Sequence, residues 1–362
     1  MTNKYLFSLK NYKWALVAAF FFGCITPGTK FFISNLPPQS MAGLLYFGAG
    51  IGLFSILAIR NALKSSFERI EKKDYKWFFL ATFFGGILGP AFLTYGISQI
   101  SGSTASLLLN LEAVLTSLIA WFIFKEHFEK KIVYGMILIV LGCLSLSINS
   151  ASAAGTDTLA GFLLICLACL SWGIDNNVTR KISHLDPMLL ASLKGLIAGS
   201  SNLFLGYLIG ERLFVSTDLA YTGLLCFFGI GVSLVAFIIS LSSIGTARTG
   251  AVFSTAPFIG SLISITLLGE PITLPVILAL VLMAAGVWMH FSEDHEHEHL
   301  HEELHHEHEH IHDGTDEHHD HHHDHVDPKA PHVHQHTHRM MVHKHPHFPD
   351  IHHQHAHKSE EH

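Results

Sequence analysis

The first 291 residues of this chain are poor in charge and nearly free of histidine. Of the 30 histidines in the 362-residue chain, 27 fall after residue 291, and charged residues make up only 14% of the whole. No phosphate-binding loop occurs, which argues against a process driven directly by ATP. No nucleophile and base are spaced as hydrolysis requires, so an enzyme is not expected. What remains is a strongly apolar body joined to a polar tail.

The charge of the chain divides at the same place. Residues 1–291 contain 18 Lys and Arg against 12 Asp and Glu, a net charge of +6, whereas residues 292–362 contain 4 against 17, a net charge of −13. No basic surface of the kind that binds nucleic acid is indicated. The five cysteines all lie in apolar runs, which favours reduced packing residues over disulfides or metal ligands. The first apolar run has no small-residue cleavage site behind it, so we interpret it as a retained anchor.

Long apolar runs recur through the body. A helix needs about 20 mostly apolar residues to cross the hydrocarbon core of a bilayer, and turn residues separate the runs. The expected fold class is therefore an all-α polytopic membrane protein with a tail. Hydropathy predicts ten spans: 14–33, 40–59, 76–97, 103–124, 132–149, 159–179, 187–209, 219–241, 248–268 and 272–291.

Basic residues predict the orientation of these spans. If the N-terminus is cytoplasmic, fifteen Lys and Arg residues fall in cytoplasmic segments, and only Lys30 and Arg212 fall toward the other side. Ten spans return the C-terminus to the cytoplasm. We therefore expect a multi-pass protein of the cytoplasmic (inner) membrane with both termini inside. Residues 1–13 would form a cytoplasmic N-terminus and residues 292–362 a cytoplasmic tail.

The two halves of the body resemble each other at an offset near 145–150 residues. Gly-Cys-Ile-Thr-Pro-Gly-Thr-Lys at 23–30 parallels Gly-Ile-Asp-Asn-Asn-Val-Thr-Arg at 173–180, with a basic residue ending each run. A unit of five spans crosses the membrane an odd number of times, so its second copy must be inserted upside down. We expect inverted five-helix repeats over 14–149 and 150–291. Transporters with this architecture hold substrate near the midplane, where the repeats meet.

The body also resembles a known family over about residues 14–291. It is similar to the EamA type of the drug/metabolite transporter superfamily. The resemblance implies two five-helix repeats and secondary transport by alternating access, often export of metabolites, amino acids or toxic compounds. The tail lies outside the family pattern. The residues that carry the resemblance are Ser171-Trp172-Gly173, Thr179-Arg180-Lys181, Ala247-Arg248-Thr249-Gly250-Ala251, Ala256-Pro257, Glu126 and Gly269-Glu270.

Several polar residues fall inside the predicted spans. Ionisable groups at membrane depth are costly and usually face the interior of a bundle. Glu112 in the fourth span and Asp175 in the sixth are therefore candidates to bind substrate or a coupling proton, with Asn110 and Asn176 beside them in the sequence. An ion pair between Asp175 and Lys194 that joins two helices is the alternative for those two residues. Hydrogen bonding across helices is the alternative for Asn110.

Lys30 and Arg180 occupy matched positions in the two repeats, and therefore lie near opposite membrane faces. They are candidate gates for the two mouths of a pathway. The alternative is that both side chains extend along the apolar surface to the lipid headgroups.

The tail has the composition of a metal chelator. Neutral imidazole binds Zn, Ni, Co and Cu, and carboxylates assist. Because almost no apolar residue could form a core, we expect a disordered chain with many interchangeable sites. No cofactor is required by this interpretation. The candidate metal ligands are His295, His297, His299, His301, His318, His319, His321, His322, His323, His352, His353, His355 and His357.

The function predicted first is export of a small metabolite or toxic organic solute, with a tail that binds transition metals. The alternatives are export of a divalent transition metal, or a metal-responsive membrane sensor or scaffold. Metal as cargo would call for imidazole or thiolate ligands along the spans, and the body contains only three histidines. The expected partners are the lipid bilayer, a small-molecule substrate and transition metal ions, with a second copy of the chain as a further candidate.

Overall fold

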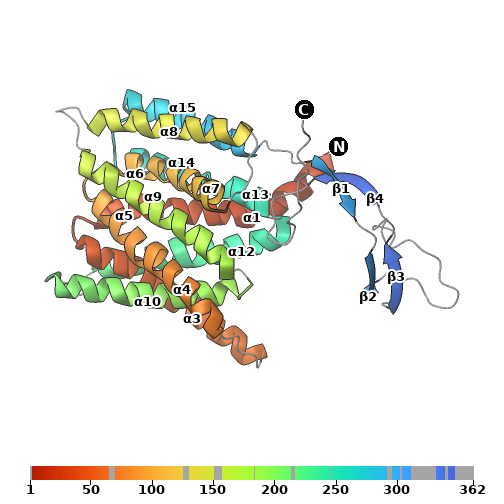
Figure 1. Cartoon of the computed structure of the whole chain (residues 1–362). Coiled ribbons are helices and arrows are strands. Elements are labelled where there is room, and N and C mark those ends of the chain that lie inside the picture. The colour runs from red at the N-terminus through yellow and green to blue at the C-terminus, as the bar shows by residue number, and fades with distance from the viewer. Residues whose placement is uncertain are drawn as a thin grey trace. The chain divides into compact units, whose positions relative to one another are not determined.

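The structure is a computed structural model of the whole chain, and it falls into two units (Figure 1). The first unit is Met1–Glu293 and the second is Asp294–His362. The residues described are 2–64, 70–124, 130–150, 157–182, 184–212, 217–244, 246–291, 296–301, 304–310, 332–338 and 341–346.

The first unit is built from apolar helical segments. Two shorter apolar helices, Ala256–Leu267 and Leu274–Met289, lie where the ninth and tenth spans are predicted. The all-α polytopic fold is thus confirmed, and the segments agree with the ten expected. The eight that are long and apolar enough to cross a membrane are Tyr12–Phe32, Pro38–Arg60, Lys72–Ile97, Gly102–Ile123, Lys130–Ser147, Leu159–Ile182, Pro187–Leu208 and Thr217–Phe237.

These segments are divided into helices of different length. The α-helices are α1 (Thr2–Gly23), α2 (Ile25–Phe32), α3 (Pro38–Lys64), α4 (Tyr75–Ala81), α5 (Gly89–Ile97), α6 (Gly102–Leu108), α7 (Leu111–Phe124), α8 (Lys130–Ser150), α9 (Leu159–Thr179), α10 (Pro187–Leu208), α11 (Thr217–Cys226), α12 (Ser233–Ile244), α13 (Thr246–Phe253), α14 (Ala256–Leu267) and α15 (Leu274–Phe291). Two 3₁₀ turns, η1 (Lys72–Asp74) and η3 (Arg180–Ile182), and two π-helical segments, η2 (Thr82–Leu88) and η4 (Phe227–Val232), complete them.

Three of the spans are interrupted along their length. α1 gives way to α2 at Cys24, two residues separate α6 from the start of α7 at Leu111, and two residues separate α13 from the start of α14 at Ala256. The second and third breaks lie 145 residues apart, from Leu111 to Ala256. They therefore fall at the same position in the two repeats. In transporters, broken helices of this kind bring backbone groups to the substrate site.

The third span of each half contains a π-helical segment. η2 separates α4 from α5, and η4 separates α11 from α12. Their first residues, Thr82 and Phe227, are again 145 residues apart. A π-helical turn disturbs the regular hydrogen-bond ladder of the helix and is often found at functional sites. Two local irregularities that recur at one offset support the two-repeat architecture.

The largest buried apolar cluster joins the two halves of the chain. It contains Ile97 of α5, Leu107 of α6, Ile139 of α8, Ile165 of α9 and Met283 of α15. In Figure 1, α8 and α15 run side by side, and they pack extensively. The first three of these residues come from the first repeat and the last two from the second. The core therefore does not form within either repeat alone.

α3 and α10 pack through glycine at backbone distance. A Cβ added to Gly50 would lie 2.5 Å from Leu196 N, and one added to Gly195 would lie 2.8 Å from Gly50 Cα. One turn further along α10, Gly199 lies against the backbone of Phe47. Small residues let membrane helices approach this closely. The contact fixes the second span against the seventh.

Gly195→Ala is expected to destabilise this packing by about 1–3 kcal/mol, because the added methyl group can displace only the backbone of α3. Thermal unfolding of the purified protein in detergent measures the change. Gly223→Ala is the matched control, since a Cβ there would meet nothing within 4 Å. Equal melting temperatures for the two variants would show that the α3–α10 contact can accommodate an added methyl group.

The second unit is described in four short strands. β1 (Glu296–His301) pairs antiparallel with β4 (Met341–Pro346), and β2 (Leu304–His310) pairs antiparallel with β3 (His332–His338). The sequence predicts a tail without regular structure, whereas these segments form ladders. Their alternation of histidine with other residues has the period of two of a β-strand, and pairing satisfies the backbone groups.

Candidate functional site

The polar groups of the spans converge on α9, which has one face toward lipid and one toward the bundle. Leu163, Leu167 and Leu170 recur every three or four residues and are 51, 42 and 37% exposed, so they mark the lipid face. Cys169 and Asp175, away from that stripe, are buried. The polar residues of α9 therefore point into the bundle, where a charge must be paired or solvated.

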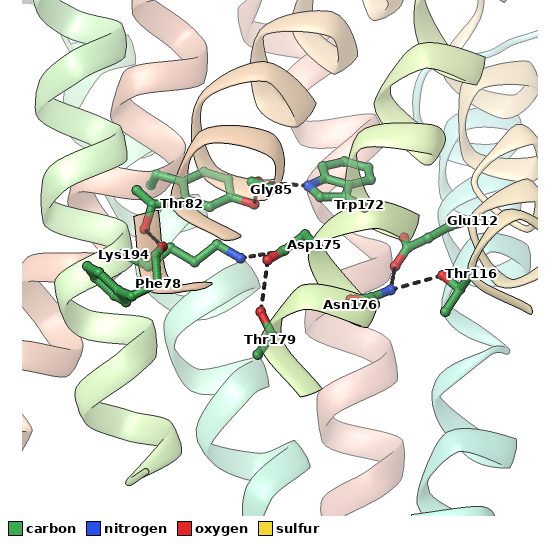
Figure 2. A network of polar contacts seen from close by, with 11 residues as sticks. Phe78, Thr82, Gly85, Glu112, Thr116, Trp172, Asp175, Asn176, Thr179 and Lys194 are labelled. Atoms are coloured by element: carbon green, nitrogen blue, oxygen red, sulfur yellow. Dashed lines mark hydrogen bonds and ion pairs between the residues drawn. The ribbon is translucent and has the colours of Figure 1, made fainter. Parts of the chain in front are cut away.

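Asp175 of α9 forms an ion pair with Lys194 of α10 (Figure 2). Its other carboxylate oxygen accepts a hydrogen bond from Thr179 Oγ1 at 2.9 Å. The side chain of Asp175 is 9% exposed and that of Lys194 is 20% exposed. The structure therefore brings these two predicted residues together as a pair between neighbouring spans. This contact is the alternative to a pathway role that the sequence left open.

The π-helical segment η2 is held by side chains from three other helices. Gly85 O accepts hydrogen bonds from Tyr46 Oη at 2.9 Å and from Trp172 Nε1 at 3.0 Å, and Gly86 O accepts one from Asn202 Nδ2 at 3.2 Å. These donors compensate for the hydrogen bonding that a π-helical turn disturbs. They come from α3, α9 and α10, so the irregular third span is fixed beside the Asp175 pair.

Asn176 points to the opposite side of α9 from Asp175, toward α7 (Figure 2). Its Nδ2 donates to Glu112 Oε1 at 2.9 Å and to Thr116 Oγ1 at 3.2 Å. Among the described residues, Glu112 has no ion-pair partner. Asn176 is exposed although it lies away from the leucine stripe of α9. The Glu112–Asn176 group is therefore not fully enclosed by the described residues.

Asn110 lies at the break between α6 and α7 and is buried. Its Nδ2 donates to Leu107 O at 3.0 Å and lies 3.8 Å from Met283 Sδ of α15. The amide thus adds a second hydrogen bond to a carbonyl that already accepts one from Asn110 N at 3.1 Å, and it contacts another span. These contacts are those of the helix-bonding alternative given for Asn110 from the sequence.

Lys30 lies at one end of the bundle and is held by backbone carbonyls. Its Nζ donates to Ile97 O at 2.9 Å and to Ile100 O at 2.6 Å, where α5 ends. The ammonium therefore joins α2 to the end of α5. Arg180 begins the 3₁₀ turn that follows α9, toward the other end. We call these two ends of the bundle the Lys30 end and the Arg180 end.

Two carboxylates complete the Lys30 end. Glu270 accepts hydrogen bonds from Gly102 N at 2.6 Å and Ser103 N at 2.7 Å, and Asp157 accepts one from Ser101 N at 2.6 Å. A carboxylate at a helix N-terminus satisfies free N–H groups and meets the positive end of the helix dipole. Sequence reasoning placed Glu270 at a span end but missed its partner, which is 168 residues away.

At the Arg180 end, Asp186 starts α10. It accepts hydrogen bonds from Met188 N at 2.7 Å and Leu189 N at 3.1 Å and forms an ion pair with Arg60 of α3. Partial burial acts to raise the pKa of Asp186, but Arg60 and the two backbone N–H groups hold that pKa below its ordinary value. This charged cap fixes the start of α10, and with it the position of Lys194.

The described residues contain no group of three or more His, Cys, Asp or Glu that could hold a metal ion. Three of the predicted tail ligands, His297, His299 and His301, lie in β1. His297 is opposite His345 of β4, and His299 is opposite His343. The others lie outside the described residues: His295, His318, His319, His321, His322, His323, His352, His353, His355 and His357.

Comparisons with known proteins agree with a transporter fold. An uncharacterized transporter of Methanothermobacter thermautotrophicus is 25% identical over 298 residues, which cover 79% of this chain and 87% of the relative. The uncharacterized transporter YetK of Bacillus subtilis is 24% identical over 124 residues, 34% of this chain and 37% of that protein. One crystal structure is similar with a TM-score of 0.56 at 14% identity, covering 77% of this chain and 96% of that one, which is a likeness of fold alone.

The family profile matches both halves of the body. The EamA-like transporter profile fits residues 9–148 and fits a second time at residues 159–292. These matches cover most of the chain and leave the histidine tail outside. Together with the ten apolar helical segments, they establish that the chain belongs to the EamA-like transporter family.

Proposed function

We propose that the protein is a secondary-active transporter of the cytoplasmic membrane that exports a small metabolite or toxic organic solute by alternating access. The observation that carries this proposal is the Glu112–Asn176 group. Among the described residues Glu112 has no ion-pair partner, and a carboxylate in an apolar bundle is costly unless it binds a proton or a positively charged group. It lies beside the broken fourth span, where transporters of this architecture hold their substrates.

The charges near α9 support exchange at Glu112. Counted in their ionised forms, Glu112, Asp175 and Lys194 sum to a charge of −1, and the Lys194 ammonium is paired with Asp175. A coupling proton, or a positively charged group on the substrate, would neutralise the remaining charge. Thr116 and Asn176 offer additional hydrogen bonds to such a ligand. Binding of a proton and binding of a solute would then compete for one carboxylate.

The two ends of the bundle would act in turn as gates. Lys30 and Arg180 lie at matched repeat positions, and Lys30 already joins α2 to the end of α5. With the termini in the cytoplasm, the Lys30 end faces outward and the Arg180 end faces inward. We propose that the tail binds Zn, Ni, Co or Cu on the cytoplasmic side. Export of a divalent metal is the second candidate, favoured by the 27 histidines of the tail.

Proteoliposomes with an imposed pH gradient test the proposal. Labelled amino acids and organic amines, with ⁶⁵Zn in parallel vesicles, serve as probes, and an enclosed pH dye reports proton movement. We expect solute flux that depends on the gradient, and no accumulation of ⁶⁵Zn. A variant lacking residues 295–362 should keep the solute flux and lose zinc binding. Accumulation of ⁶⁵Zn without solute flux would favour the metal exporter, and no flux of any probe would favour a sensor or scaffold.

A further inference from the structure

Unpartnered hydroxyl groups gather at one helix interface. Of the five buried side-chain oxygen atoms without a hydrogen-bond partner among the described residues, three lie on α6 and α14, and a fourth lies on α2, which packs against both. A buried hydroxyl without a partner destabilises the state that buries it. These four residues, each at most 1% exposed, are Ser106, Ser261, Ser264 and Thr29.

The α6–α14 interface is close, and serine side chains pack there directly against glycine. A Cβ added to Gly260 would lie 2.8 Å from Ser106 Oγ and 2.8 Å from Gly23 O, and a Cβ added to Gly102 would lie 2.7 Å from Ser264 Oγ. The hydroxyls of Ser106 and Ser264 therefore face glycine backbone across the contact, and Ser261 lies next to Gly260 in the sequence of α14. We call Ser106, Ser261 and Ser264 the hydroxyl seam.

The hydroxyl seam belongs to the Lys30 end. Gly102 N at the start of α6 is also capped by Glu270, and Lys30 is held at the end of the preceding helix, α5. α6 and α14 lie in the fourth and ninth spans, whose repeat counterparts are α13 and α7. Among the described residues, α7 and α13 do not pack in this way. Within the described residues, the α6–α14 contact at the Lys30 end therefore has no equivalent contact between α7 and α13 at the Arg180 end.

Water fits the seam better than a cation. A hydroxyl both donates and accepts hydrogen bonds, as water requires, whereas a cation would need a surplus of negative charge. The ammonium of Lys30, next to Thr29 in the sequence, would repel a second cation. An opening that lets water reach the hydroxyl seam would give each of its three hydroxyls a hydrogen-bond partner.

We propose that the hydroxyl seam is the surface that parts when the Lys30 end opens, and that water then hydrates its three serines. The inference rests on the alternating access proposed above. In the closed form, the unpartnered hydroxyls raise the free energy, while the contacts of Lys30 and Glu270 lower it. These opposing contributions bring the closed and open forms close enough in free energy to alternate.

Hydrogen–deuterium exchange of the full-length protein in lipid nanodiscs tests this proposal without a substrate. Ser106→Ala, Ser261→Ala and Ser264→Ala should each slow exchange of the α6 amides by about fivefold, because the closed form loses an unpartnered hydroxyl. Their melting temperatures should equal or exceed that of the wild type. Lys30→Met should speed exchange in the same peptide.

Ser145→Ala is the matched control, since its hydroxyl is buried in α8 but donates to Gly142 O at 2.7 Å. It should leave α6 exchange unchanged. Exchange that is unchanged or faster in the three seam variants would mean that their hydroxyls already have partners, and would overturn the proposal. Slowed exchange in a protein that moves no probe would support the seam while ending the transport proposal. The two ideas can therefore fail separately.

Discussion

Glu112→Gln is expected to lower transport by about a hundredfold or more in a protein that still folds and inserts. Glutamine keeps the shape of the side chain and can still accept the hydrogen bond from Asn176. It can neither bind a proton at this site nor neutralise a positively charged group, and hydrogen bonds to a charged partner are stronger than those between neutral groups. Gradient-driven solute flux in proteoliposomes measures the loss.

The control for this variant is the same substitution at a carboxylate with a structural contact. Glu211 accepts hydrogen bonds from Gln39 N at 3.1 Å and Ser40 N at 2.7 Å, and so caps α3 at the Lys30 end. Glu211→Gln should cost about 1 kcal/mol of stability, as the loss of a cap does, and should retain transport. Normal flux in Glu112→Gln would remove Glu112 from the site.

Lys194→Met and Asp175→Asn are each expected to destabilise the protein by about 3 kcal/mol or more. Either substitution leaves the other charge between α9 and α10 without its partner, and an unpaired charge in a low-dielectric bundle is strongly unfavourable. The double variant should recover most of the loss, because no charge is then left unpaired. Unfolding of the four proteins in detergent gives the coupling energy of the pair.

Transport by the double variant decides between the two interpretations of this pair. If Asp175 and Lys194 only join two helices, the folded double variant should transport as the wild type does. If they bind substrate, the double variant should be stable but inactive. Equal stability of all four proteins would mean that water or lipid headgroups already solvate both charges, and the pair would then have no structural role.

Hydropathy was sufficient to locate the spans, because burial in lipid leaves a signal in every residue of a helix. The second span, predicted at 40–59, is found at Pro38–Arg60. The ninth was predicted as one helix over 248–268, yet it is broken before Ala256. A hydropathy window averages over such a break, since two turn residues, Ser254 and Thr255, count for little among the apolar residues on either side. The same averaging prevents hydropathy from revealing the two π-helical segments.

The site could be predicted only where both partners are side chains of recognisable type. Asp175 and Lys194 are 19 residues apart in consecutive spans, so their pairing was a visible alternative. Glu112 and Asn176 are 64 residues apart, and each was a candidate without a named partner. The partners of Lys30 are backbone carbonyls, which every residue has. No sequence pattern distinguishes such partners, and their identification required the fold.

The ion pair between α9 and α10 also sets an order of events during synthesis. Asp175 leaves the ribosome 19 residues before Lys194, so α9 reaches the translocon with an unmatched carboxylate. The most favourable course is for the two helices to enter lipid together as a hairpin, with the charges already joined. The glycine face of α3, by contrast, carries no charge that needs a partner, so α3 can enter lipid before α10 packs against it.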